Sequence, residues 1–369
     1  MSRITKLRLG RVAYERGRDP IRVGASIFRY AATVAAVEAE GGALGLGVVW
    51  TQLDDELSYL RALQPVLEAA IVGQPADLPF VSGSAVRAAG LRVDGGRIAS
   101  AIEQALFDLA GRLLNVPCYQ LLGARRHTIP SYVISAEDFF LEGTADTIAL
   151  AERYVADGFK ACKFHLWGDA RRDIETLHAL RHALGNDIAL MLDPTSRYGR
   201  PEALAVGRVI EELGFIRFED PLPPADAAGY RWLGRHLSVP LMANETLTWS
   251  PEQCAQAARD GAVQGFRFNV MRAGIGEALR HGAVADGNGA ELDIAAFVPR
   301  GSLEASLHVA LAAPASRWFE HHRALGLDEV PGLSPGFSIE KGIATPNGAP
   351  GFGLGIDWAE LDRHTQWTE

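Results

Sequence analysis

Three acidic residues, Asp193, Glu219 and Glu245, follow one another at intervals of 26 residues. Each ends a short apolar run that is typical of a buried strand: IALMLD, IRFED and PLMANE. One strand, one helix and two loops take roughly 25 residues, so this spacing predicts successive strand ends of a (β/α) barrel. Carboxylates that converge at the mouth of such a barrel repel each other unless a cation lies between them. The pattern therefore indicates a site for a hard divalent cation.

A lysine and a histidine, Lys163 and His165, end the preceding strand candidate, KACKFHL. Residues two positions apart in a strand lie on the same face, so both side chains are expected at the mouth. Three carboxylates would leave about three positions on Mg²⁺ for water and substrate oxygens. A cation placed there polarises a substrate carboxylate and stabilises the enediolate that forms when the α-proton leaves. Lys163 is a natural base for that proton.

The elements that would position these residues alternate between strands and helices from residue 126 to residue 330. The strand candidates are IPSYVIS, KACKFHL, IALMLD, IRFED, VPLMANE, VQGFRFN, ELDIAAF and SRWFEHH. Between them lie segments with helical spacing of Ala and Leu, such as IETLHALRHALG. This order predicts one complete barrel of the TIM type.

Residues 1–125 do not follow this alternation. Two strand candidates, RITKLRLGRVAYE and GGALGLGVVWTQ, precede two helical segments, ELSYLRALQPVLEAAI and RIASAIEQALFDLAGRLLN. Between the two strands, GRDPIRVGASIFRY is expected to form a loop. We therefore expect a small α+β domain ahead of the barrel. The segment 331–369, rich in Gly and Pro, is expected to be irregular and to pack on that domain.

Composition and charge disfavour several classes of function. The 369 residues are 48% hydrophobic and 22% charged, which is ordinary for a globular protein. The net charge of −9 argues against nucleic-acid and anionic-membrane partners. The opening MSRITKLRLG lacks the apolar core of a signal peptide, and the apolar stretch 31–50 is interrupted by Glu38, Glu40 and a Gly-Gly pair. With three widely spaced cysteines, we expect a cytoplasmic protein with reduced thiols.

Across the barrel segments and the end of the N-terminal domain, the sequence resembles the enolase superfamily. Within it, the resemblance is to the mandelate racemase and muconate lactonizing enzyme branch. The resemblance lies in AIEQALFDLAGRLLNVPCYQLLGAR, GFKACKFHLWGD, LMLDP, FEDP, MANET and RAGIGEAL. It implies an α/β fold, a TIM-type (β/α)7β barrel with an N-terminal α+β capping domain that the C-terminal tail completes. It also implies Mg²⁺ held by Asp193, Glu219 and Glu245. The same resemblance implies two specificity loops, near residues 16–30 and 50–55. It also implies assembly into a homo-oligomer.

Three positions depart from the family pattern. His165 stands where the family has a second lysine that usually carries the base, so His165 competes with Lys163 for that role. Asn269 and Ala295 stand where relatives place proton carriers on strands six and seven. Because neither side chain can carry a proton at neutral pH, a racemase with two bases is disfavoured. Glu320 matches a glutamate that in mandelate racemase hydrogen-bonds the substrate carboxylate.

The leading hypothesis is Mg²⁺-dependent dehydration of an acid sugar, a lyase reaction that begins with loss of the α-proton to Lys163 or His165. The alternatives are an isomerase, either a lactone cycloisomerase or an epimerase, and a homologue that binds a carboxylate without turnover. Substrate contacts are expected from Asn269, Arg272 and Glu320, with Arg272 as a carboxylate clamp. A small carboxylic acid is the expected partner.

Overall fold

The structure is a computed structural model. It describes residues 2–18, 27–51, 56–89, 96–135, 141–243, 250–323 and 328–368, with the backbone alone for residues 14–18, 27–30 and 135. Most of the two expected specificity loops and the expected metal ligand Glu245 lie outside the described residues.

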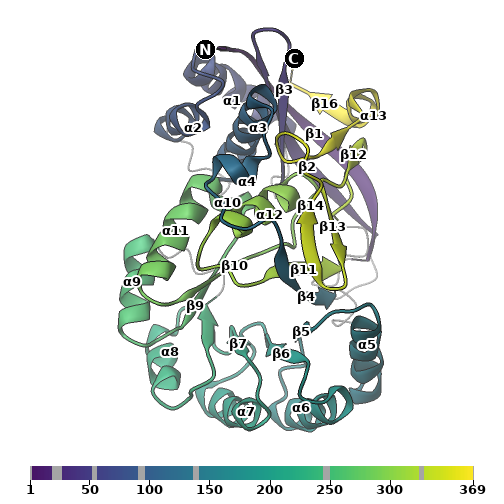
Figure 1. Ribbon diagram of the computed structural model, residues 1–369, viewed down its shortest axis with the longest axis vertical. Helices are drawn as coiled ribbons and strands as arrows, with labels where there is room; N and C mark the ends of the chain where they lie inside the picture. The colour runs from purple at the N-terminus through teal and green to yellow at the C-terminus, as the bar shows by residue number, and fades with distance from the viewer. Residues whose placement is uncertain are drawn as a thin grey trace.

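The N-terminal part forms a cap above the barrel (Figure 1). Its antiparallel sheet has the order β16-β1-β2-β3. The strands are β1 (Ile4–Arg18), β2 (Ile27–Ala39), β3 (Leu44–Trp50) and β16 (Thr365–Trp367). The helices are α1 (Glu56–Ile71), α2 (Pro79–Ala88), α3 (Arg97–Leu114) and the short α4 (Cys118–Leu121). A side chain at Gly47 would lie 1.9 Å from the Ala101 carbonyl oxygen, so this glycine allows α3 to pack closely against β3.

Two expectations for the cap were wrong. Residues 27–30, placed in a loop, begin strand β2, and helix α2 was not predicted. The apolar stretch 31–50 is a hairpin of β2 and β3 that turns at Gly41 and Gly42. Both glycines have left-handed φ values, 87° and 81°, which other residues rarely adopt. Because β2 is apolar on both faces, it lacks the alternation by which a strand is recognised.

The barrel consists of eight parallel strands, all of them at the expected segments. They are β4 (Ile129–Ser135), β5 (Ala161–Phe164), β6 (Ala189–Leu192), β7 (Arg217–Glu219), β8 (Leu241–Ala243), β9 (Gly265–Phe268), β10 (Glu291–Ile294) and β11 (Phe319–Arg323). Neighbouring strands pair from β4 to β10, β11 pairs with β4, and β10 contacts β11, which closes the barrel.

Helices follow the first seven of these strands. They are α5 (Thr144–Ala156), α6 (Ala170–Leu184), α7 (Arg200–Glu212), α8 (Ala227–Gly234), α9 (Pro251–Arg259), α10 (Val270–Ala273), α11 (Ile275–Gly287) and α12 (Ser302–Ala312). The fold is therefore the expected α/β architecture, a TIM-type (β/α)7β barrel with an N-terminal cap. No helix in the described ranges combines the length and hydrophobicity that crossing a membrane would require.

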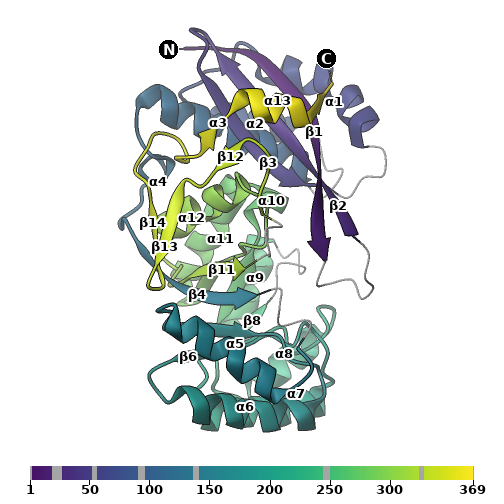
Figure 2. The ribbon, with the colours of Figure 1, turned by 90° about the vertical axis from the view of Figure 1, so that its right-hand side faces the viewer.

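The C-terminal tail is more ordered than expected. It contains β12 (Leu333–Ser334), β13 (Phe337–Glu340), β14 (Ile343–Pro346), β15 (Gly355–Ile356), α13 (Trp358–His364) and β16. Strand β14 pairs with β4 of the barrel, and β16 pairs with β1 of the cap. Figures 1 and 2 both show α13 and β16, in yellow, beside β1. These strands have only two to four residues, and β14 and β16 also pair with strands far away in the sequence, so the local pattern gives little indication of them.

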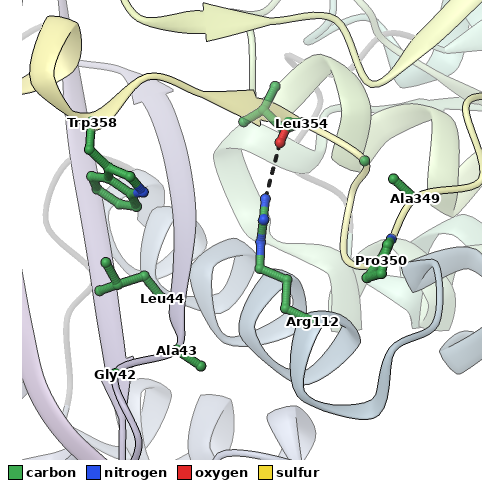
Figure 3. A pocket seen from close by; sticks show the side chains of 9 residues that line it. Gly42, Ala43, Leu44, Arg112, Ala349, Pro350, Leu354 and Trp358 are labelled. Atoms are coloured by element: carbon green, nitrogen blue, oxygen red, sulfur yellow. Dashed lines mark hydrogen bonds between the residues drawn. The ribbon is translucent and has the colours of Figure 1, made fainter.

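A hollow of about 420 Å³ lies where the tail meets the cap (Figure 3). Trp358 and Leu44 stand on one side, and Arg112 donates from Nη2 to the Leu354 carbonyl oxygen at 3.1 Å across the hollow. The Arg112 guanidinium also contacts Asp108 at 2.8 Å. The hollow therefore belongs to the seam between the tail and the cap, and none of the expected site residues lines it.

Direct contacts hold the cap over the barrel. The Trp50 amide at the end of β3 donates to the Met271 sulfur at 3.2 Å, and Ser100 of α3 donates to the Val270 carbonyl at 2.7 Å. The Tyr119 amide donates to Nδ1 of His308 on α12 at 3.0 Å. Trp50 is therefore placed beside the loops that follow the barrel strands.

Because His308 is buried, we expect the protein to lose stability as the pH falls. Burial lowers the pKa of His308 from its ordinary value near 6.5 to about 3. Between these values the unfolded chain binds the proton more readily, so this contribution to stability is present above pH 6.5 and is lost as the pH falls towards 3. The loss amounts to about 1.4 kcal/mol per pH unit at most.

We expect His308→Gln to be less stable at neutral pH than the unaltered protein and to show a shallower acid dependence. Urea unfolding at several pH values measures both effects. His182→Gln, on the exposed face of α6, is the matched control and should parallel the unaltered protein. Equal slopes for His308→Gln and the unaltered protein would contradict the assignment.

Candidate active site

A buried lysine lies among three carboxylates from different barrel strands. Nζ of Lys163 on β5 is 3.0 and 3.1 Å from the two carboxylate oxygens of Glu219 on β7. It is 3.3 Å from Oε1 of Glu320 on β11 and 3.6 Å from Oδ2 of Asp193, which follows β6. The Lys163 side chain is only 1% exposed. The barrel thus brings together four residues that the sequence predicts for the site.

Tight turns orient the carboxylates of Asp193, which follows β6, and of Glu219, which ends β7. Thr195 and Ser196, just beyond Asp193, have left-handed φ values of 50° and 63°, and Asp220, directly after Glu219, has a φ of 43°. Non-glycine residues adopt such values at a cost, and they concentrate at functional sites. The Thr195 amide donates to Oδ1 of Asp193 at 2.8 Å, while Oδ2 faces Lys163. The Ser196 amide donates to the Asp220 carbonyl at 2.8 Å and links the two turns.

Charges inside the barrel shift the pKa values of this group. Burial and Arg267 lower the pKa of Lys163, but the carboxylates of Glu219, Glu320 and Asp193 outweigh them and raise it above its ordinary value. Burial opposes ionisation of Asp193, yet His165 and Lys163 bring its pKa below the usual range. Burial raises the pKa of Glu219 to about 7, against the opposing effect of Arg267 and Lys163.

His165 directly follows β5, two residues beyond Lys163 in the chain. Its Nε2 is 3.3 Å from Oδ2 of Asp193, and the residue is 9% exposed. The two candidates for the base therefore differ in their surroundings. Lys163 is enclosed by carboxylates, whereas His165 contacts the rim of the same cluster.

Arg267 on β9 is a member of the site that the sequence interpretation missed. Its Nε is 3.2 Å from Oε1 of Glu219, its Nη1 is 2.6 Å from Oδ2 of Asp293, and its Nη2 is 2.6 Å from both carboxylate oxygens of Glu320. The available signal was an arginine inside the apolar run VQGFRFN, two residues before Asn269 and so on the same face. Arg267 lies inside its strand, whereas the spacing of the acidic residues indicates site residues at strand ends.

A second polar layer lies against these residues. The Tyr132 hydroxyl lies 2.8 Å from Oδ2 of Asp293 and 3.2 Å from Oε1 of Glu320. Arg217 is 2.7 Å from Oε1 of Glu291 and 3.3 Å from Oδ1 of Asp293. The barrel interior therefore holds a network of ion pairs where an apolar core is usual for this fold.

Glu320 has its acceptor positions filled by the protein. Its carboxylate accepts from Arg267, from the Ala296 amide at 2.6 Å and from Tyr132, and it faces Lys163. Burial raises the pKa of Glu320, but Arg267 and Lys163 bring it well below its ordinary value. An ionised carboxylate has no proton to donate, so Glu320 here orients Arg267 and Lys163 and is poorly suited to bind a substrate carboxylate.

The remaining predicted residues occupy the rim. Oδ1 of Asn269 accepts the Met271 amide at 3.0 Å and so caps α10. Arg272 is half-buried in α10, and among the described residues no hydrogen bond or ion pair connects it to Lys163, Asp193, Glu219 or Glu320. Ala295, which follows β10, has a buried side chain that carries no polar group.

The residues present fit a hard cation. Asp193 and Glu219 present carboxylate oxygens within 3.6 Å of one point, the Lys163 ammonium, which supplies positive charge between them. Oxygen donors of this kind suit Mg²⁺. Glu245 follows β8 by two residues and is not described. Within the described ranges, no three His, Cys, Asp or Glu side chains are arranged to hold a metal, so the set of three ligands stays a prediction.

Two family models match the chain. Residues 10–123 match the mandelate racemase / muconate lactonizing enzyme N-terminal domain, and residues 146–360 match the enolase C-terminal domain-like family. The two matches correspond to the cap and the barrel.

Similar proteins include enzymes of two reaction classes. The L-Lys-D/L-Arg epimerase of Methylococcus capsulatus is 30% identical over 259 residues, which cover 69% of this chain and 71% of the epimerase. The arabinonate dehydratase of Saccharolobus solfataricus is 33% identical over 229 residues, 60% of each chain. The structure of a Bordetella bronchiseptica protein in complex with 2-oxoglutarate/phosphate superposes with a TM-score of 0.87 at 26% identity, over 99% of this chain and 98% of that one.

Proposed function

Because the chain belongs to the enolase superfamily, in its mandelate racemase and muconate lactonizing enzyme branch, we propose that it removes the α-proton of a carboxylate substrate with the help of Mg²⁺. One observation carries the proposal. Lys163 on β5 contacts the carboxylates of Asp193 and Glu219 inside the barrel, and His165, two residues further along the chain, contacts Asp193. A proton acceptor beside a set of oxygen ligands is what this reaction requires.

Asp193, Glu219 and Glu245 would hold the metal. When bound, Mg²⁺ supplies positive charge that offsets the negative charge developing on the substrate carboxylate. The ammonium of Lys163 lies beside Asp193 and Glu219 and adds a second positive charge. Glu320 and Arg267 keep this ammonium and the Glu219 carboxylate in place.

The surroundings of the two candidate bases favour His165 as the proton acceptor. Lys163 faces Glu219, Glu320 and Asp193, and these carboxylates occupy its hydrogens. His165 lies nearer the mouth, where a substrate enters from the side of the cap. The alternative, with Lys163 as the base, requires the substrate to reach deeper into the carboxylate cluster.

Dehydration of an acid sugar is the reaction we place first. Neither Asn269 nor Ala295 can return a proton to the opposite face of the α-carbon, which two-base racemisation requires. A single base at the end of β5, the second strand of the barrel, is sufficient to start a dehydration. The similarity to an epimerase keeps an isomerase as the second candidate.

Solvent deuterium exchange tests the proposal. The protein is incubated with Mg²⁺ and a mixture of aldonic and aldaric acids in D₂O, and the acids are then analysed for label and for product. We expect deuterium at an α-carbon, or a dehydrated product, for at least one acid. Ligand binding that depends on Mg²⁺ but gives neither label nor product with any acid would favour a non-catalytic homologue.

Glu219→Gln should weaken metal binding. A ligand that binds only the folded state stabilises it by about 2.7 kcal/mol at 100 times its dissociation constant. We therefore expect Mg²⁺ to raise the melting temperature of the unaltered protein, and to do so much less for Glu219→Gln. Glu212→Gln, at an exposed position on α7, should keep the full stabilisation. A Glu219→Gln variant stabilised as strongly as the unaltered protein would refute the ligand assignment.

A further inference from the structure

His322, near the end of β11, is the second residue of interest on this strand. It lies two residues beyond Glu320 and therefore on the strand face that points into the barrel. The residue keeps partial exposure, but its Nδ1 is screened from solvent and has no hydrogen-bond partner among the described residues. Buried polar atoms nearly always have partners, so an exception beside a site calls for an explanation.

The cap and the barrel both shape the surroundings of His322. The Phe297 ring, from the loop after β10, lies 4.5 Å from the His322 ring, centroid to centroid. Trp50, at the end of β3 in the cap, meets Phe297 edge-on at 5.2 Å. Phe297 therefore packs against the imidazole on one side, and Trp50 of the cap packs against Phe297.

The electrostatic surroundings place His322 next to the site. After burial, the groups that shift its pKa are Glu320, His165, Lys163 and Arg267, all members of the site. Burial, together with His165, Lys163 and Arg267, outweighs Glu320 and lowers the pKa of His322 to about 3. The imidazole is therefore neutral at physiological pH. A neutral ring offers a substrate carboxylate no charge, but in either tautomer its Nδ1 can pair with a hydroxyl group, which both donates and accepts.

We propose that His322 is a substrate-contacting residue that hydrogen-bonds a hydroxyl group of the acid, and that it thereby selects hydroxylated acids over acids without that hydroxyl. The inference rests on the proposed function and adds to it a residue that recognises a hydroxyl group of the substrate. A site that hydrogen-bonds a substrate hydroxyl rejects the analogue lacking it, because the polar group of the protein is then left without a partner. This substrate contact would come from β11, from which the sequence predicts only Glu320 as a substrate-binding residue.

Three variants test the role of His322. His322→Phe keeps a ring against Phe297 and removes both nitrogens, while His322→Asn restores a polar group near the position of Nδ1. His321→Phe is the control, because His321 points to the opposite face of β11, where it stacks on Phe159 at 5.5 Å. The readouts are KM and kcat for the acid that the unaltered protein exchanges fastest, and for its deoxy analogues, with the melting temperature as a check on folding.

For His322→Phe we expect KM to rise about three- to tenfold, the loss of one neutral hydrogen bond, with kcat less affected. His322→Asn should recover part of the loss, and His321→Phe should leave KM unchanged. One deoxy analogue should show the same KM with the unaltered protein and with His322→Phe.

An unchanged KM for His322→Phe, in a folded variant, would overturn the inference while the proposed function stands. A raised KM that persists equally for every deoxy analogue would also overturn it, because no hydroxyl would then be the partner. No exchange by the unaltered protein with any acid would overturn the proposed function, and the inference with it.

Discussion

Replacing His165 with asparagine is expected to lower α-proton exchange by about 10²- to 10⁴-fold, the usual contribution of a general base. Asparagine is polar and of similar reach but cannot take up a proton. Because Asp193 and Glu219 are unchanged, Mg²⁺ should still raise the melting temperature of the variant. Exchange by NMR and thermal unfolding with and without Mg²⁺ separate the two effects.

The opposite outcome identifies the other base. If His165→Asn exchanges at nearly the rate of the unaltered protein and Lys163→Met does not exchange, then Lys163 takes the proton. Lys163→Met alone cannot decide the matter, because it removes the ammonium that lies among Glu219, Glu320 and Asp193. His182→Asn, on the exposed face of α6, is the control for the substitution itself.

Replacing Arg267 with methionine is expected to destabilise the protein by about 3–5 kcal/mol, the range found when one partner of a buried ion pair is removed. Arg267 is 7% exposed and contacts the carboxylates of Glu219, Asp293 and Glu320. Without its guanidinium these groups would remain buried with less compensating charge. Urea unfolding of the metal-free protein measures the loss.

Two further variants identify the cause of that loss. Arg267→Met combined with Glu320→Gln should regain part of the stability, because the double variant buries one negative charge fewer. Arg200→Met removes an exposed arginine that pairs with Asp226 and should cost little stability, because solvent screens such a pair. If Arg267→Met is no more destabilising than Arg200→Met, the buried network contributes little to stability.

The barrel could be predicted, and metal ligands could be proposed, because the signals for both are local. Each strand is a short apolar run, and Asp193 and Glu219 stand at the ends of their runs. Parallel strands of one barrel must end at the same mouth, so an even spacing along the chain is converted into proximity in space. The same reasoning put Lys163 and His165 on one face of β5.

Contacts across the barrel could not be predicted in this way. The contacts of Arg267 with Glu219, Asp293 and Glu320 depend on how far the strands that carry these residues are shifted along one another. The tilt of the strands and the register of the closed barrel set that shift. Glu320 shows the consequence. Its type and position suggested a substrate contact, but its four protein partners favour a supporting role.

The sequence by itself determined the strand order and the barrel, because the strand period and the spacing of βα units fix both. From the same spacing it predicts the oxygen ligands of a cation and the pair of candidate bases. Only the tertiary structure decided how the tail completes the cap, that Arg267 joins three carboxylates, and that His322 lies with Phe297 and Trp50 at the rim. The physical reason is the same in each case. These arrangements join side chains that are far apart in the sequence, and their distances are set by the packing of the whole molecule.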